Sequence, residues 1–174
     1  MSDPPVAICN SGPLIALGKL NRLDLLEPVF GEVEITQEVY REVVEEGQAL
    51  GAPDALSVRM FWESRGWPII QVPESVLSKY TQHPILGPGE REVIALALAI
   101  KSPLVLLDDE VARSEARRLR LDLCGTLGVP VRAFRGRLLS FEQVAFLLQE
   151  IAARPDIWIS ARLCEDVLNE LRRP

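Results

Sequence analysis

Acidic side chains that could bind a metal ion recur at three places in the sequence. They are Asp108 and Asp109 after an apolar run, Glu90 and Glu92 at the start of an apolar segment, and Glu42 within a polar one. Mg²⁺ and Mn²⁺ are hard cations that take oxygen ligands, usually a few carboxylates with water completing the shell. Such ions generate hydroxide and stabilise in-line displacement at phosphorus. These residue types therefore indicate carboxylate-bound metal chemistry.

The acids after residue 89 also have structural explanations. Glu90 and Glu92 would be favoured at a helix N-terminus by the helix dipole alone, and Asp109 can serve as a helix N-cap. Asp108 is less easily explained as a cap. Glu92 heads a segment that is otherwise apolar, so we expect its turn to pack inside the domain, where an acid needs a partner or a metal.

Glu42 is the least selective of these signals. It shares its predicted helix with Glu38, Glu45 and Glu46, and a solvated helix face accounts for all four. Spacing alone does not single it out.

The elements that must position these residues alternate between strands and helices. Strands are predicted at 6–9, 32–35, 67–72, 104–107 and 121–124; helices are predicted at about 11–20, 23–30, 37–46, 55–65, 90–100 and 109–120, with three more helical stretches up to residue 174. Residues 47–54 are predicted to be turns and 73–89 irregular. The alternation predicts an α/β fold, a three-layer α/β/α sandwich around a central parallel sheet with extra C-terminal helices.

Ligands of such folds bind at the carboxyl ends of the strands. Asn10, the Asp108-Asp109 pair and Gly125-Thr126 each directly follow a predicted strand. We therefore expect them along one edge of the sheet, with Ser11 as a helix cap beside Asn10.

Length and composition narrow the function. A chain of 174 residues predicts a single domain, 1–174, with a C-terminal helical extension at about 138–174. His83 is the only histidine and the three cysteines are widely spaced, which argues against Ser-His or Cys-His catalysis and His-rich zinc sites. The net charge of −6 argues against a general nucleic-acid coat. We expect no membrane segment and, without a recognisable signal peptide, a cytoplasmic protein.

Several segments resemble a known family in the right order along nearly the whole chain. Ile8-Cys-Asn-Ser-Gly-Pro-Leu-Ile-Ala-Leu17 resembles the start of a PIN domain, and Glu34-Ile-Thr-Gln-Glu-Val-Tyr-Arg-Glu-Val43 resembles its second segment. Gly89-Glu-Arg-Glu-Val-Ile-Ala-Leu-Ala97 and Leu106-Leu-Asp-Asp-Glu-Val-Ala-Arg113 are similar to its third and fourth acidic segments. Gly125-Thr-Leu-Gly-Val129 and Trp158-Ile-Ser160 are similar to an uncharacterised prokaryotic branch related to VapC-type toxins.

The resemblance implies a PIN-type, Mg²⁺- or Mn²⁺-dependent endoribonuclease, a hydrolase of phosphodiesters, or a descendant of one. Its metal and catalytic site would consist of Asn10, Glu42, Glu92, Asp108 and Asp109. Supporting residues would be Ser11, Glu90 and Thr126.

The first position departs from the family pattern, because Asn10 stands where the usual residue is aspartate. An amide oxygen can ligate Mg²⁺ but brings no negative charge, so metal affinity should fall. This leaves open a catalytically weak or inactive PIN-like nucleic-acid-binding or scaffold protein.

Arginines supply candidate contacts for RNA, structured or single-stranded. Arg113 and Arg117 lie on one predicted helix, and Arg132 and Arg135 follow; together they could hold a phosphate backbone. A solvated helix face with ion pairs explains them equally well. The three tryptophans are expected in the core or at a partner. The resemblance to toxins further suggests a toxin–antitoxin role, with a homodimer and a small antitoxin protein.

A regulatory receiver domain also uses paired acids on a parallel sheet. Its acidic pair should follow the first strand and a lysine should end a late strand. Here the first strand ends in Asn10 and Lys101 precedes a strand, so the pattern does not favour a receiver domain.

Overall fold

A computed structural model describes residues 6–80, 85–101 and 104–173, so His83 and the N-terminal segment considered above lie outside the described residues. The chain divides into two compact units, 1–126 and 127–174, and each is treated by itself. Within the described part of the chain, no helix is both long and apolar enough to cross a membrane.

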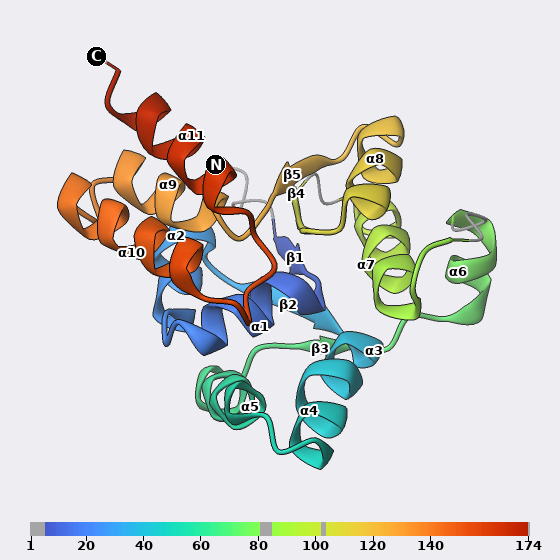
Figure 1. The fold of residues 1–174 in the computed structure, drawn as a ribbon. Helices are drawn as coiled ribbons and strands as arrows, with labels where there is room; N and C mark the ends of the chain where they lie inside the picture. The colour runs from blue at the N-terminus through green and yellow to red at the C-terminus, as the bar shows by residue number, and fades with distance from the viewer. Residues whose placement is uncertain (1–5, 81–84, 102–103, 174) are drawn as a thin grey trace. The chain divides into compact units, whose positions relative to one another are not determined.

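The first unit is built on a five-stranded sheet in the order β3-β2-β1-β4-β5 (Figure 1). The strands are β1 (Ala7–Cys9), β2 (Val33–Thr36), β3 (Ile69–Ile70), β4 (Leu104–Leu106) and β5 (Asp122–Cys124). Every neighbouring pair is parallel. The predicted parallel sheet is therefore confirmed.

Burial of the strands explains why their sequences are continuous apolar runs. All residues of β1 and β4 are buried, as expected for central strands covered by helices on both faces. The edge strand β5 is only partly buried. A polar residue placed directly after β1 or β4 is consequently held at the rim of a fixed core.

Helices flank the sheet and complete the α/β/α sandwich. They are α1 (Ser11–Lys19), η1 (Leu23–Leu25), α2 (Leu26–Phe30), α3 (Gln37–Tyr40), η2 (Arg41–Glu46), α4 (Gly47–Ala49), α5 (Pro53–Arg65), α6 (Glu74–Tyr80), α7 (Pro88–Ala99) and α8 (Glu110–Arg118). Helix α7 contacts β1, β2 and β4, and its residues Val93–Ala97 are all buried. Its apolar sequence reflects this position.

Two helices occupy segments that were predicted to be irregular. The helix that begins at Gln37 continues through α4 to Ala49, because Gly47 packs against Ala55: an added Cβ would lie 2.8 Å from the Ala55 Cβ. The glycine thus permits close packing instead of ending the helix. Helix α6 follows Pro73, which precedes its first turn and does not interrupt it.

Strand β3 is shorter than the predicted strand 67–72. Pro68 lacks the N–H that a paired strand needs, so pairing with β2 begins at Ile69. Trp67 is buried and its ring packs edge-on against that of Trp62, with centroids 5.2 Å apart.

The second unit contains the three predicted C-terminal helices, α9 (Gly128–Arg135), α10 (Phe141–Ala153) and α11 (Ala161–Leu171). Ser140 and Ser160 cap α10 and α11 by accepting hydrogen bonds from the N–H groups of Gln143 and Leu163. Trp158, in the segment between α10 and α11, is 97% exposed, so of the two predicted positions the core is wrong for this tryptophan and a partner contact stays a prediction.

The burial of β4 predicts a large effect of truncating its last residue. Leu106 is fully buried, so Leu106→Ala should lower the free energy of unfolding by about 2–5 kcal/mol. Leu56→Ala is the control, because Leu56 is 53% exposed; it should change stability by less than about 0.5 kcal/mol. Urea denaturation followed by circular dichroism measures both, and equal effects would contradict the central position of β4.

Candidate metal centre

The ends of three neighbouring strands bring the predicted site residues to one edge of the sheet. Cys9 pairs with Leu106 and Leu106 pairs with Cys124. Beyond these pairs, the Asn10 N–H donates to the Leu106 carbonyl at 3.0 Å and the Leu107 N–H donates to the Cys124 carbonyl at 2.9 Å. The backbone therefore places Asn10, Asp108 and Thr126 at the same edge.

Asn10 has a buried polar atom that the protein does not satisfy. The residue is 7% exposed, and its Oδ1 atom has no hydrogen-bond partner among the described residues. Asn10 occupies the N-cap position of α1 but its side chain makes no capping hydrogen bond. An unsatisfied buried acceptor costs about 1–3 kcal/mol, so this oxygen is suited to a ligand that supplies positive charge.

Asp108 is held firmly beside the start of α1. Its Oδ1 accepts the Thr126 N–H at 2.8 Å and its Oδ2 accepts the Thr126 hydroxyl at 2.6 Å. A Cβ added to Gly12 would lie 3.4 Å from Oδ2, so the carboxylate lies against the first turn of α1. Thr126 itself is fully buried. Thr126 was predicted to support the site, and these two hydrogen bonds orient both carboxylate oxygens of Asp108.

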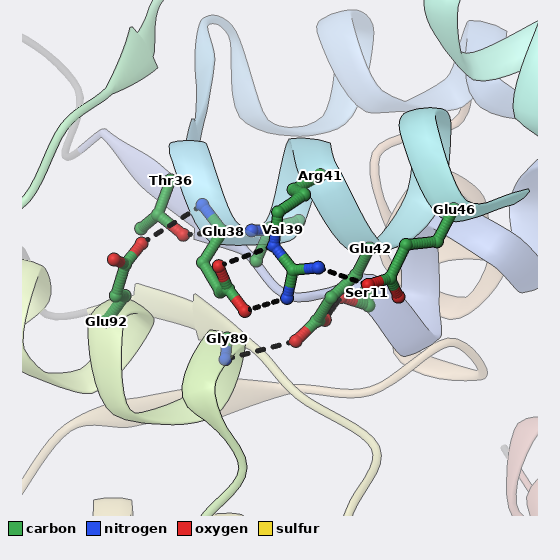
Figure 2. A network of polar contacts seen from close by, with 9 residues as sticks. All are labelled: Ser11, Thr36, Glu38, Val39, Arg41, Glu42, Glu46, Gly89 and Glu92. Atoms are coloured by element: carbon green, nitrogen blue, oxygen red, sulfur yellow. Dashed lines mark hydrogen bonds and ion pairs between the residues drawn. The ribbon is translucent and has the colours of Figure 1, made fainter.

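Glu42 differs from the other glutamates of its helix, as Figure 2 shows. Its carboxylate accepts the Ser11 hydroxyl on one oxygen and, at 3.2 Å, the Gly89 N–H on the other. Ser11 is therefore a partner of Glu42 and not the cap of α1. Glu42 lies on the π-helical turn η2 and connects it to the starts of α1 and α7.

The neighbouring glutamates of Glu42 are engaged elsewhere. Glu38 and Glu46 both pair with Arg41 (Figure 2), and Glu45 is exposed. The solvated-face explanation holds for these three and fails for Glu42. Arg41 pairs with Glu38 and Glu46, so the donors that bind Glu42 among the described residues are uncharged.

Glu90 lies in the field of two other acids. Its side chain accepts the Gly87 N–H at 2.8 Å and so caps its own helix. Burial raises the pKa of Glu90, and the charges of Asp109 and Glu42 raise it further, while the Gly87 hydrogen bond opposes them. These charge effects link Glu42, Glu90 and Asp109 at one place.

Glu92 and Asp109 have structural partners in the described chain. The Glu92 carboxylate accepts the Glu38 N–H at 3.2 Å, which joins α7 to the start of α3 (Figure 2). Asp109 caps α8 by accepting the Ala112 N–H at 2.9 Å. Of the two glutamates at the start of α7, the structure brings Glu90, and not Glu92, toward Glu42 and Asp109.

The donor set fits a hard cation that keeps much of its water. All the candidate ligand atoms are oxygens, and no residue that the structure describes donates a hydrogen bond to Asn10 Oδ1. Across the described residues, no three Asp, Glu, Cys or His side chains converge closely enough to enclose a metal. Mg²⁺ is commonly bound through one or two carboxylates with several waters, so a few protein oxygens suffice.

Two glycines and Arg113 lie beside these carboxylates; Arg113 was predicted as an RNA contact and Gly125 at this edge, whereas Gly89 had been assigned no role. A Cβ on Gly89 would lie 2.8 Å from Glu42 Oε2, and a Cβ on Gly125 would lie 2.9 Å from Asp108 Oδ1. The same Cβ on Gly125 would lie 3.1 Å from Nη1 of Arg113, which donates to the Leu107 carbonyl at 2.8 Å. The available signal for Gly89 was its place directly before Glu90.

The other arginines predicted to bind RNA are distributed over both units. Arg117 on α8 pairs with Glu110 at 2.8 Å, as the ion-pair explanation expected. Arg132 and Arg135 lie on α9 in the second unit, where Arg135 pairs with Glu170 at 3.8 Å.

The crowding at Gly125 predicts a position-specific effect of one methyl group. Gly125→Ala forces Asp108 or Arg113 to move and should lower stability by about 1–3 kcal/mol. Gly12→Ala is the matched control beside the same carboxylate, because its Cβ meets Asp108 at an ordinary 3.4 Å inside a helix. It should be neutral or stabilising by up to about 1 kcal/mol in thermal unfolding. Equal tolerance of both variants would contradict this packing.

Glu90 predicts a pH dependence of stability in buffer containing a chelator. The pKa of Glu90 is raised in the folded state. Its contribution to the free energy of unfolding is therefore complete below the pKa of the unfolded chain and is lost as pH rises through the pKa of the folded protein. Stability should therefore decline above about pH 4.5 through this residue, and Glu90→Gln should flatten that decline. Exposed Glu74→Gln is the control. Urea denaturation at several values of about pH 4–8 measures the free energy of unfolding of each variant. If it changes with pH in the same way for the wild type and Glu90→Gln, the proximity of Glu90 to Glu42 and Asp109 is contradicted.

Comparison with known proteins identifies the family of the chain. A family model described as a PIN domain matches residues 6–173. Among curated proteins, none matches the chain. The match spans nearly the whole sequence and both units, and the parallel sheet agrees with it. The chain belongs to the PIN-domain family.

Proposed function

We propose that this protein is a Mg²⁺- or Mn²⁺-dependent endoribonuclease that hydrolyses phosphodiester bonds at the sheet edge. PIN domains have a nuclease-type fold and generally use divalent metals. The observation that carries the proposal is the buried Asn10 Oδ1 after β1, which has no hydrogen-bond partner in the described part of the chain and lies at the edge where Asp108 follows β4.

Asn10 and Asp108 would hold the cation, with Glu42 and Asp109 adding negative charge around it. When bound, the cation supplies an acidified water and offsets phosphate charge. Glu90 is the preferred residue to take a proton from an attacking water, because its pKa is raised toward neutral pH. Glu92 would act indirectly, by holding α3 in position. Its carboxylate accepts a hydrogen bond from the Glu38 N–H in the first turn of that helix.

Arg113 is the arginine best supported as a phosphate contact. It is half-buried beside Gly125 and Asp108, and its Nη1 is fixed on the Leu107 carbonyl. A guanidinium at the edge of a metal site can bind a non-bridging phosphate oxygen. Arg117, Arg132 and Arg135 remain candidates for contacts to flanking nucleotides.

A binding protein that does not cut RNA is the second candidate. The neutral side chain of Asn10 favours it, as does the small number of converging acids among the described residues. A VapC-like toxin role, with a homodimer, an antitoxin partner and a cytoplasmic site of action, is supported by the sequence resemblance alone.

The charge at position 10 decides between these candidates. Asn10→Asp adds one negative charge at the proposed ligand and should tighten Mn²⁺ binding at least about tenfold. Cleavage of structured and unstructured RNA should be at least as fast as in the wild type. Asp108→Asn should weaken Mn²⁺ binding by a similar factor. Calorimetric titration with Mn²⁺ and gel assays of labelled RNA measure the two effects.

Asn21→Asp is the matched control, because it makes the same chemical change at an exposed position. It should alter neither Mn²⁺ affinity nor cleavage. If wild type and Asn10→Asp both bind Mn²⁺, stay folded and leave every RNA intact, the protein binds without cutting. If Asn10→Asp leaves Mn²⁺ affinity unchanged, the metal does not lie at Asn10.

A further inference from the structure

Glu42 is carried by a helical turn of a rare kind. Its turn, η2, is π-helical, whereas α3 before it and α4 after it are α-helical. The backbone hydrogen bonds of a π turn join residues five apart, and such turns occur mostly as single turns inside α-helices. A π turn holds one more residue than an α turn, so it changes the direction in which the neighbouring side chains point. The direction of Glu42 therefore depends on this turn being kept.

Arg41 joins the two ends of the π turn on its solvent-exposed side, as Figure 2 shows. Its Nε atom donates to Glu38 Oε2 at 2.9 Å, its Nη2 atom donates to the other oxygen of Glu38, and its Nη1 atom donates to Glu46. Arg41 and Glu46 are the first and last residues of η2. Residues five apart point about 140° away from each other on an α-helix but in similar directions on a π turn. The ion pair between Arg41 and Glu46 therefore fits the π turn better than an α-helix.

The buried side of the same helix does not select the π turn by itself. Val39 is followed one turn later by two consecutive buried residues, Val43 and Val44. Val43 is four residues from Val39 and Val44 is five, so the core is contacted at both the α and the π spacing. Since the core accepts either spacing, the ion pairs of Arg41 on the exposed side are left to favour the π turn.

The site tolerates little change in the direction of Glu42. Its carboxylate accepts hydrogen bonds from Ser11 and Gly89, and a Cβ on Gly89 would lie only 2.8 Å from it. A return to α spacing would rotate one part of the helix by about 100° against the other. Thr36 and Glu92 hold the first turn of α3, so the rotation would fall on the residues after it, including Glu42.

We propose that Arg41 is a positioning residue for Glu42: by binding Glu38 and Glu46 it keeps the π turn that directs the Glu42 carboxylate to the sheet edge. The inference rests on the proposed function only for what Glu42 does there, which is to add negative charge around the cation. The contact between Glu42 and the Gly89 N–H can be measured without any metal.

Amide hydrogen exchange of the metal-free full chain, followed by NMR, measures the position of Glu42. In Arg41→Gln the Gly89 N–H should exchange at least about threefold faster than in the wild type, because its acceptor has moved. The Gly87 N–H is the internal control, because it donates to Glu90 at 2.8 Å just before the same helix and should keep its rate. An unchanged rate at Gly89 would overturn the proposal.

Arg59→Gln is the matched control variant, because Arg59 is exposed and pairs with Glu63 on α5 at 2.8 Å. It loses the same charge and an ion pair of the same kind, and it should leave the exchange of Gly87 and Gly89 unchanged. Equal acceleration of Gly89 in Arg59→Gln would show a general loss of rigidity and would overturn the proposal.

The direction of the change in Mn²⁺ affinity separates positioning from a simple charge effect. Removal of a positive charge near the edge would by itself tighten the binding of a cation. We expect the opposite in Arg41→Gln, a dissociation constant about three- to tenfold higher in calorimetric titration, because Glu42 no longer faces the ion. In the Glu42→Gln background the same substitution should not weaken binding. Tighter binding in Arg41→Gln, or equal weakening in both backgrounds, would overturn the proposal.

A second variant keeps the inference testable if Arg41→Gln does not fold, which circular dichroism checks. Glu46→Gln removes only the ion pair that spans the π turn and should also speed exchange at Gly89, with exposed Glu45→Gln as its control. An unchanged Gly89 rate in Glu46→Gln would count against Arg41 in the same way. If not even the wild type binds Mn²⁺, the proposed function fails, and the exchange rates still decide the role of Arg41.

Discussion

The pairing of β1 with β4 is the constraint on which the site depends. Cys9 and Leu106 are in register, and the Asn10 N–H continues the pairing onto the Leu106 carbonyl. Because parallel strands end at the same edge, whatever residue follows each strand is presented there. The convergence of Asn10 and Asp108 is thus a property of the backbone, and the side chains only determine what the edge can bind.

Hydrogen bonds from uncharged groups then keep that edge negative. Glu42 is bound by a hydroxyl and a backbone N–H, and Asp108 by the N–H and hydroxyl of Thr126. Such donors orient a carboxylate without cancelling its charge. Arg41, which could neutralise Glu42, is bound by Glu38 and Glu46. A surplus of negative charge in a partly buried place is favourable for a cation and costly without one.

The sequence predicted the sheet and the residues at the carboxyl ends of its strands well, because both depend on local patterns. Apolar runs marked the buried strands, and the residues after them marked the edge. The roles of the glutamates depended on contacts across long stretches of chain. Glu42 meets Ser11 and Gly89, and Glu92 meets the start of α3, across separations of 31, 47 and 54 residues. No local spacing distinguishes Glu42 from its neighbours or Glu90 from Glu92.

Helix boundaries were missed where a residue had more than one use. Gly47 was expected to end a helix, yet it serves close packing against Ala55. Pro73 was expected to keep its segment irregular, yet it precedes the first turn of α6. Glycine and proline each allow more than one local backbone structure, and tertiary contacts decide which of them forms.

Thr126 has one more consequence, which concerns the backbone at the end of the first unit. It is the last residue of the first unit, and Leu127 begins the second. The backbone N–H and the hydroxyl of Thr126 donate hydrogen bonds to the two carboxylate oxygens of Asp108. A substitution that moves the backbone at residue 126 would therefore also turn the Asp108 carboxylate, even if the threonine hydroxyl were kept.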